Sequence, residues 1–237
     1  MTRTIGLIGG MSWESSAEYY RLLNEGVRQR LGGHHSARVV LHSLDFAEVA
    51  AMQRAGDWAA AGAALAEAGR GLERAGVDLV LLCTNTMHRV ADTVEAAVGV
   101  PFLHLVDCTA ERLAGAGLRR AGLLGTRHTM ELPFYRDRMR ARGVEVVVPE
   151  AADRAVVDAV IYDELTRGRI EESSRAEYRR IIARLAERGA QGVILGCTEI
   201  TLLIGERDSP VPVFDSTRLH VEAALDLALA PAAAPAD

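Results

Sequence analysis

Cysteine is scarce in this sequence. Only Cys83, Cys108 and Cys197 occur among 237 residues, and no two of them have the C-x-x-C spacing. Disulfide frameworks and zinc modules need several cysteines at short, paired spacings, so both are excluded. His34 and His35 lie in a Gly-bounded stretch without nearby Cys or carboxylate ligands, and we predict no metal site. Reduced thiols in this number are typical of a cytoplasmic protein.

Long apolar runs and concentrated positive charge are also missing. No run approaches the ~18 to 20 residues that a membrane span needs, and the opening residues lack the basic segment and cleavage site of a signal peptide. The net charge is −5. Nucleic-acid and anionic membrane surfaces need clustered Lys and Arg, so neither partner is expected. We expect a soluble cytoplasmic protein that binds a small molecule.

A dinucleotide-binding loop is a third absence. Residues 5–10 read IGLIGG, without the G-x-G-x-x-G order of nicotinamide and flavin folds. These glycines are better explained by a tight turn and a close approach of the backbone. We therefore predict no cofactor.

What the sequence does contain is a duplicated segment. Residues 80–88 read VLLCTNTMH and residues 193–200 read VILGCTEI, each with an apolar run followed by Cys-Thr. The two cysteines are 197 − 83 = 114 positions apart. A helical segment that ends at a glycine, Gly76 or Gly189, precedes each copy, and a Val-Pro step follows each one. The repeat predicts two halves that are built alike.

Strand-like and helix-like segments alternate along both halves. Near-continuous apolar runs such as Val77–Leu82 are typical of strands in a parallel sheet with helices on both faces. The predicted fold class is α/β, with two similar Rossmann-like domains of mostly parallel sheets and an active site in the cleft between them. We place the N-terminal domain at residues 1–106 plus 211–237 and the second domain at residues 107–210. Residues 231–237 are expected to form a frayed tail.

The duplicated cysteines are candidates for acid/base chemistry. The pattern predicts a helix over Thr86–Val98 and a strand over Val100–Val106. Cys83 would then stand between a strand and a helix, as Cys197 would after its own strand. The helix dipole favours a thiolate at such a position and lowers the thiol pKa.

The residues that follow each cysteine suit a bound carboxylate. Thr84, Asn85 and Thr86 follow Cys83, and Thr198 follows the second cysteine, so hydroxyls, an amide and free backbone N–H groups are available. A thiolate on one face of the α-carbon and a thiol on the other face would then exchange protons with it. This arrangement would invert a stereocentre without a metal, flavin or pyridoxal group.

Structural roles compete with this interpretation. A lone cysteine at a strand end is commonly a small buried apolar residue, and we interpret Cys108 in this way because it has no twin. Thr198 is equally compatible with a helix cap, and His88 suits a capping or supporting role better than catalysis. The matched placement of Cys83 and Cys197 favours catalysis for this pair.

Together these motifs resemble the aspartate/glutamate racemase family, within the wider Asp/Glu/hydantoin racemase superfamily. The matching segments run across nearly the whole chain in the order of that family: IGLIGGMSWESS at 5–16, LHSLDF at 41–46, LLCTNTMH at 81–88, LLGTRHTM at 123–130, IYDEL at 161–165, GVILGCTEI at 192–200 and VPVFDSTRLH at 211–220. The resemblance implies two α/β domains related by a pseudo-two-fold, a cofactor-independent two-base mechanism and a homodimer.

The resemblance also assigns roles to single residues. It implies that Cys83 and Cys197 are the acid/base thiols of a broad-specificity amino-acid racemase. The remaining positions would contact the amino-acid substrate: Thr84, Asn85, Thr86 and Thr198 at its carboxylate, Glu199 at its ammonium group, Met11 and Gln53 nearby, and Thr126 by its strand-tip location.

One departure from the family concerns the substrate side chain. Some aspartate racemases carry a lysine after the IYDEL segment and an arginine in the early loop, and both serve the distal carboxylate. Here Thr166 stands near the lysine position, and the segment 45–49 reads DFAEV without that arginine. Arg54, Arg127 and His128 are the nearby cationic candidates.

Two alternatives stay open. A hydantoin racemase or a maleate isomerase-type cysteine enzyme would use the same scaffold for other chemistry. A non-catalytic amino-acid-binding protein would use the same groups only to hold a ligand. Retention of both thiols favours the racemase.

Overall fold

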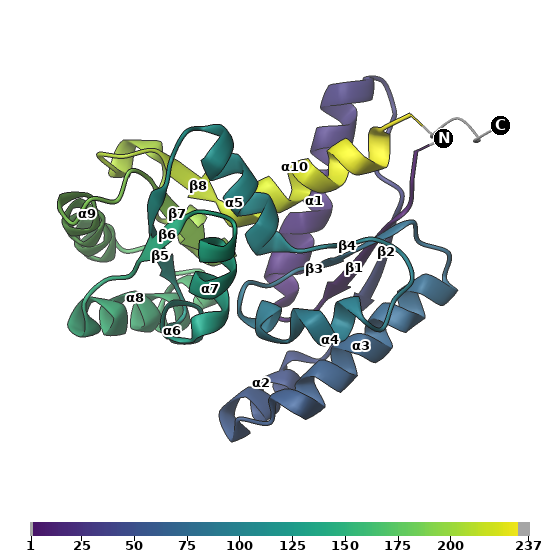
Figure 1. Cartoon of the computed structure of the whole chain (residues 1–237), viewed down its shortest axis with the longest axis horizontal. Coiled ribbons are helices and arrows are strands. Elements are labelled where there is room, and N and C mark those ends of the chain that lie inside the picture. Colours follow the sequence, from purple (N-terminus) through teal and green to yellow (C-terminus); the bar gives the residue numbers. More distant parts are fainter. Residues whose placement is uncertain (1, 232–237) are drawn as a thin grey trace. The chain divides into compact units, whose positions relative to one another are not determined.

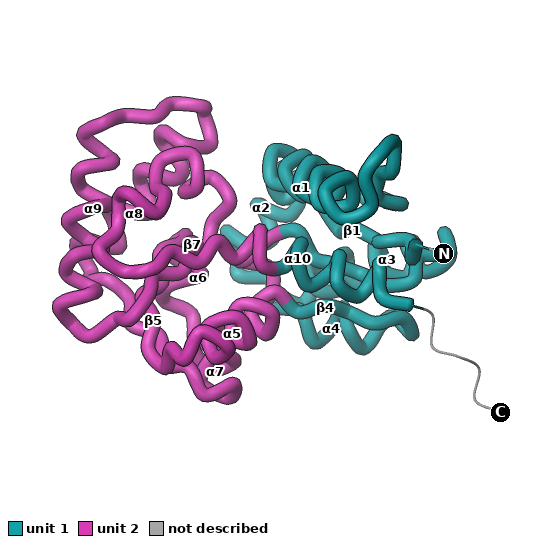
Figure 2. Tube along the Cα trace, turned by 90° about the horizontal axis from the view of Figure 1, so that it is seen from above, with its two compact units in different colours: residues 1–83, 90–104, 220–237 teal, residues 84–89, 105–219 magenta. Residues whose placement is uncertain are grey.

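The computed structural model describes residues 2–231. Met1 and residues 232–237 lie outside this part, and with them nearly all of the predicted tail at 231–237. The chain divides into two compact units, which Figure 2 colours separately. Unit 1 comprises residues 1–83, 90–104 and 220–237, and unit 2 comprises residues 84–89 and 105–219.

Unit 1 is built on a four-stranded sheet of order β2-β1-β3-β4 in which all neighbours are parallel. Its strands are β1 (Ile5–Gly9), β2 (Val39–Ser43), β3 (Leu79–Leu82) and β4 (Phe102–Leu103). The central strands β1 and β3 are buried along their whole length. Apolar residues at every position of these strands are explained by helices on both faces of the sheet.

The helices of unit 1 lie on the two faces of this sheet (Figure 1). On one face Ile5, Leu7 and Leu81 pack with Leu23 of α1 and Leu225 of α10. The opposite face is covered by α3 and α4 (Figure 1). The helices are α1 (Trp13–Leu31), α2 (Phe46–Ala55), α3 (Trp58–Arg74), α4 (Ala91–Glu95) and α10 (Ser216–Leu229), the last of which begins in unit 2.

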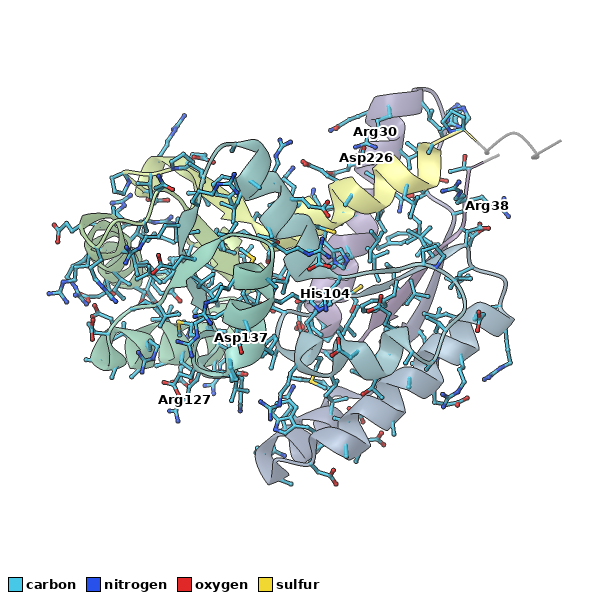
Figure 3. All side chains as sticks on the ribbon, viewed as in Figure 1. Arg30, Arg38, His104, Arg127, Asp137 and Asp226 are labelled. Atoms are coloured by element: carbon cyan, nitrogen blue, oxygen red, sulfur yellow. The ribbon has the colours of Figure 1, made fainter. Side chains whose placement is uncertain are left out.

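An ion pair joins the two helices on the first face. Arg30 on α1 lies 2.8 Å from Asp226 on α10, and both residues are labelled in Figure 3. Both side chains keep much of their surface in water, so the pair contributes less than about 1 kcal/mol. The shared apolar core holds these helices together.

Unit 2 repeats the same sheet. Its order is β6-β5-β7-β8, again with parallel neighbours. The strands are β5 (Arg120–Gly125), β6 (Glu145–Val147), β7 (Val193–Gly196) and β8 (Val213–Asp215). Each sheet therefore has its second strand in sequence at one edge and its third strand beside the first. The predicted α/β class with two similar parallel-sheet domains is confirmed.

Two separate cores cover the faces of the second sheet. Leu124 and Leu195 pack with residues of α8 and α9, whereas Leu123 and Ile194 pack with residues of α5 and α7. The helices are α5 (Leu105–Gly115), α6 (Arg127–Glu131), α7 (Pro133–Ala141), α8 (Ala151–Asp163) and α9 (Glu172–Glu187). Short 3₁₀ helices complete the chain at Thr86–Val90, Leu165–Arg167, Thr198–Leu202 and Glu206–Asp208.

Glycine explains two chain reversals that the repeat predicts. Gly76, before β3, has φ 80°, and Gly189, before β7, has φ 89°. Residues other than glycine rarely adopt this left-handed conformation, so both helices end where the sequence places the glycine. Gly10 has φ 88°, and an added Cβ there would collide with the Leu44 carbonyl. The glycines of the IGLIGG segment thus permit a close backbone approach, as predicted.

The structure corrects the predicted boundaries. Residues 211–219 were assigned to the N-terminal domain, but β8 pairs with β7 and this segment belongs to unit 2. Conversely, residues 84–89 belong to unit 2 although their motif follows β3. The predicted strand at Val100–Val106 is only Phe102–Leu103, because helix α5 begins at Leu105. Sequence adjacency suggested these assignments, whereas tertiary contacts decide them.

No helix among residues 2–231 is long and apolar enough to cross a membrane. Within the same part of the chain, no three His, Cys, Asp or Glu side chains form a group that could hold a metal ion.

Candidate active site

Cys83 lies directly after β3, an inner strand of the first sheet. Its backbone N–H donates to the Ile8 carbonyl at 2.9 Å, and its side chain is fully buried in the core that contains Leu7 and Leu81. Burial disfavours the charged thiolate and raises the pKa of Cys83 far above its ordinary value. In the free protein this residue is therefore a neutral thiol.

Cys197 occupies the same place after β7, the corresponding inner strand of the second sheet. Its Sγ–H donates to Glu199 Oε2 at 2.9 Å. Burial and the negative charge and hydrogen bond of Glu199 raise the pKa of Cys197 well above its ordinary value. This thiol is also protonated.

The predicted lowering of the thiol pKa by a helix dipole is wrong for both cysteines. A 3₁₀ helix of five residues follows each one, Thr86–Val90 after Cys83 and Thr198–Leu202 after Cys197, and the predicted helix at 86–98 continues only as the short α4. Such short helices leave burial as the dominant influence on the thiols. The sequence predicted the position of the thiols but not their environment.

Three threonine hydroxyls form a buried cluster in unit 2. Thr86 Oγ1 lies 3.1 Å from Thr126 Oγ1 and 3.3 Å from Thr129 Oγ1, and the last two are 3.2 Å apart. Thr126 follows β5 and caps α6, because its hydroxyl accepts the Thr129 N–H. The structure thus brings Thr86 and Thr126 together. Thr129 was missed, although it stands three residues after a predicted site residue on a helical turn.

A second polar group lies at the ends of β7 and β8. Asn85 and Ser216 are hydrogen-bonded through their side chains, with Asn85 Nδ2 3.1 Å from Ser216 Oγ. Ser216 Oγ also donates to the Leu195 carbonyl of β7 at 2.8 Å. The Thr198 and Thr217 hydroxyls are 3.2 Å apart. Ser216 and Thr217 were not predicted, and their one signal is the D-S-T triplet that ends the last strand.

The predicted substrate residues divide unequally between the units. Thr84, Asn85, Thr86, Thr126, Thr198 and Glu199 belong to unit 2 together with Cys197, whereas Met11 and Gln53 belong to unit 1 together with Cys83. Met11 is buried, and Gln53 is half-buried on α2. Most of the polar groups suited to a carboxylate are therefore assembled by one unit.

The cationic candidates differ in their surroundings. Thr166, near the lysine position of some aspartate racemases, uses its hydroxyl to bond the Tyr162 carbonyl at 2.9 Å. Arg127 is exposed at the start of α6 (Figure 3), where its backbone N–H donates to Asp158. Arg54 is exposed near the end of α2, and His128 is half-buried.

Two parallel α/β units of equal strand order, each with a cysteine after an inner strand, define a two-domain α/β protein of the racemase type. A profile of the Asp/Glu/Hydantoin racemase family matches residues 8–224. The chain therefore belongs to the Asp/Glu/hydantoin racemase family, and the resemblance predicted from its motifs is confirmed.

Relatives and solved structures agree with this membership. The broad specificity amino-acid racemase RacX of Bacillus subtilis (strain 168) is 25% identical over 146 residues, a match that spans 62% of this chain and 63% of RacX. A candidate Asp/Glu racemase from Yersinia pestis is 50% identical with a TM-score of 0.92, and the match covers 96% of this chain and 100% of the other. An aspartate racemase homologue from Pyrococcus horikoshii OT3 is 34% identical with a TM-score of 0.86, covering 95% and 99%.

Proposed function

We propose that the chain is a cofactor-independent amino-acid racemase that acts on aspartate, glutamate or a related amino acid. Cys83 and Cys197 serve as its two acid/base groups. The observation that carries this proposal is the equal placement of the cysteines, each directly after the third strand of a four-stranded parallel sheet. Membership of a racemase family and the racemase activity named for RacX support the reaction class.

In the proposed reaction, one sulfur removes the α-proton and the other delivers a proton to the opposite face of the same carbon. The reverse reaction exchanges the two roles. The α-proton is weakly acidic, so the developing charge on the carboxylate needs fixed donors. The hydroxyls and backbone N–H groups of Thr84, Asn85, Thr86 and Thr198 supply them.

Formation of the thiolate is coupled to substrate binding in this proposal. Both thiols are neutral in the free protein because their pKa values are raised. The substrate brings an ammonium group, whose positive charge favours a thiolate nearby. Glu199 receives this ammonium group and already accepts a hydrogen bond from the Cys197 thiol, so substrate binding and the protonation state of Cys197 act on the same carboxylate.

Single enantiomers of aspartate and glutamate incubated with the protein in deuterium oxide test the proposal. We expect the α-proton to exchange and the opposite enantiomer to accumulate. Retention of both processes in the Cys83→Ala/Cys197→Ala double variant would contradict a two-thiol mechanism. Thermal stabilisation by an amino acid without any exchange would indicate the non-catalytic binding protein instead.

The two alternative enzymes predict different products. A hydantoin racemase would invert hydantoins but not free amino acids, and a maleate isomerase-type enzyme would give a covalent cysteine adduct visible by mass spectrometry.

A homodimer is expected, which light scattering after size-exclusion chromatography would measure. We also expect the protein to act in the cytoplasm, where its thiols stay reduced.

A further inference from the structure

A buried histidine contacts the segment that follows Cys83. His88 lies in the 3₁₀ helix Thr86–Val90 and is only 3% exposed. Its Nδ1 is 2.7 Å from the Thr84 carbonyl oxygen, and its Nε2 is 3.1 Å from the Leu105 backbone nitrogen. Thr84, His88 and Leu105 all belong to unit 2. The imidazole thus bridges the turn after the cysteine and the first residue of α5.

These partners determine where the imidazole proton resides. The Thr84 carbonyl can only accept, so Nδ1 must carry a hydrogen. The Leu105 N–H can only donate, so Nε2 must be unprotonated. His88 is therefore a neutral imidazole in the Nδ1–H tautomer.

The bond to Thr84 also sets the direction of a neighbouring donor. The peptide between Thr84 and Asn85 is trans and planar, so its C=O and N–H groups point in opposite directions. With the carbonyl directed at His88, the Asn85 N–H points away from the histidine. We find no acceptor for this N–H among residues 2–231. It is an available donor two residues after Cys83.

We propose that His88 is a positioning residue that aims the Asn85 N–H at the substrate carboxylate by holding the Thr84 carbonyl. This inference rests on the proposed function, because it assigns the carboxylate to the turn at residues 84–86. His88 transfers no proton in this role. Its bond to Leu105 anchors the imidazole to α5, so that the turn is fixed to a regular element before the substrate arrives.

No histidine occupies the corresponding position after Cys197. The residue five positions after Cys197 is Leu202, which is 53% exposed, whereas His88 stands five positions after Cys83. The second tip instead contains Glu199, bonded to its own thiol. The two tips therefore have different roles: one positions backbone donors, and the other accepts a hydrogen bond from its own thiol.

The tautomer is tested directly by NMR of the protein labelled with ¹⁵N-histidine. We expect His88 to show a protonated Nδ1 and an unprotonated Nε2 at neutral pH. An Nε2–H tautomer would overturn the inference, because Nδ1 could then not donate to Thr84. This measurement needs neither turnover nor a variant.

Two substitutions separate the two bonds. In His88→Asn the amide nitrogen takes the place of Nδ1 and keeps the bond to Thr84. In His88→Gln the amide oxygen reaches the place of Nε2 and keeps the bond to Leu105. We expect KM to rise on the order of tenfold in His88→Gln, with a smaller change in kcat, and to stay near the wild-type value in His88→Asn. Equal KM values in both variants would contradict the positioning role.

A matched control and a binding assay keep this failure distinct from failure of the proposed function. His220→Gln removes another buried histidine, in unit 1, and should leave KM unchanged. Calorimetric titration with succinate, a dicarboxylate without a stereocentre, should show weaker binding in His88→Gln alone. Absence of racemisation with succinate binding lost in His88→Gln would reject the racemase and keep the positioning role. Racemisation with unchanged succinate binding in that variant would reject the positioning role alone.

Discussion

The two Cys-Thr tips have nearly the same sequence and nearly opposite surroundings. Cys83 is enclosed by apolar side chains of its core, and the turn after it is held by a neutral histidine. Cys197 is partly exposed and bonded to a carboxylate two residues away. Burial alone keeps the first thiol protonated, whereas Glu199 contributes for the second. A duplicated motif has thus retained its position in the fold while the two copies acquired different chemical surroundings.

The largest expected effect follows from removing either cysteine of the pair. Cys83→Ala and Cys197→Ala should each lower racemisation by about a thousandfold or more, because each removes one acid/base group. Each variant should still exchange the α-proton of one enantiomer in deuterium oxide, and the enantiomer should differ between the two variants. Proton NMR of the substrate measures the exchange, and chiral chromatography measures racemisation.

The same enantiomer exchanged by both single variants would contradict the assignment of one thiol to each face. Cys108→Ala provides the matched control, because this buried cysteine on α5 has no proposed contact with substrate. It should racemise at the wild-type rate.

Glu199→Gln sharpens the comparison at the second tip. The negative charge of Glu199 disfavours the Cys197 thiolate, so its removal should lower the pKa of Cys197. The thiol should then be alkylated by iodoacetamide at lower pH than in wild type. Peptide mass spectrometry across a pH series follows this residue separately from Cys83. An unchanged pH midpoint would show that burial alone sets the pKa of Cys197.

In unit 1, a buried histidine makes stability sensitive to pH. His220 Nε2 donates to the Leu103 carbonyl at 2.9 Å, so Nδ1 accepts from the Tyr19 hydroxyl at 2.9 Å. Burial lowers the pKa of His220 from 6.5 to about 4. Below pH 6.5 the unfolded chain binds a proton that the folded chain does not, so stability falls as the pH falls toward 4.

Urea unfolding at pH 8 and pH 5 measures this effect. We expect His220 to account for a loss of about 2 kcal/mol in the free energy of unfolding at the lower pH. His220→Gln can place an amide N–H where Nε2 donates to the Leu103 carbonyl, and it does not titrate, so the same comparison should show a smaller pH-dependent loss in this variant. Equal losses in both proteins would assign the pH dependence to other groups.

The smallest expected effect concerns the hydroxyl cluster of unit 2. Thr126→Ala removes the cap of α6 and a partner of Thr86, and should lower the free energy of unfolding by about 1 kcal/mol. Thr126→Ser keeps the hydroxyl and should stay close to wild type. Denaturant unfolding of the wild type, Thr126→Ala and Thr126→Ser measures these free energies. Equal stability of the Ala and Ser variants would show that the hydroxyl does not contribute.

Prediction from sequence succeeded where the signal was local. Apolar runs of strand length placed β1, β3, β5 and β7, and the glycines Gly76 and Gly189 marked the helix ends before two of them. The edge strand β4 was predicted too long, because only Phe102 and Leu103 pair with β3. The run at 100–106 contains enough Val, Phe and Leu for a strand, yet only Phe102–Leu103 forms one, and its last two residues begin α5.

In the candidate site, too, prediction succeeded for residues with a local signal and failed for residues brought in by the fold. Cys83, Cys197 and the residues directly after them were proposed as site residues because they recur at matched positions. Thr129, Ser216 and Thr217 were missed because no local pattern links them to their partners, which are 43, 131 and 19 positions away. Their hydrogen bonds to Thr86, Asn85 and Thr198 exist only because β5, β7 and β8 are neighbours in one sheet.

The sequence by itself determined the duplication, the parallel α/β class and the placement of a cysteine after an inner strand of each sheet. These properties follow from local patterns of apolar residues, glycines and the repeat. Only the tertiary structure decided that both thiols are neutral, that Glu199 bonds Cys197, and that His88 holds the Thr84 carbonyl. Proton affinity and hydrogen-bond direction depend on the dielectric and on nearby charges, which arise from residues that folding brings together.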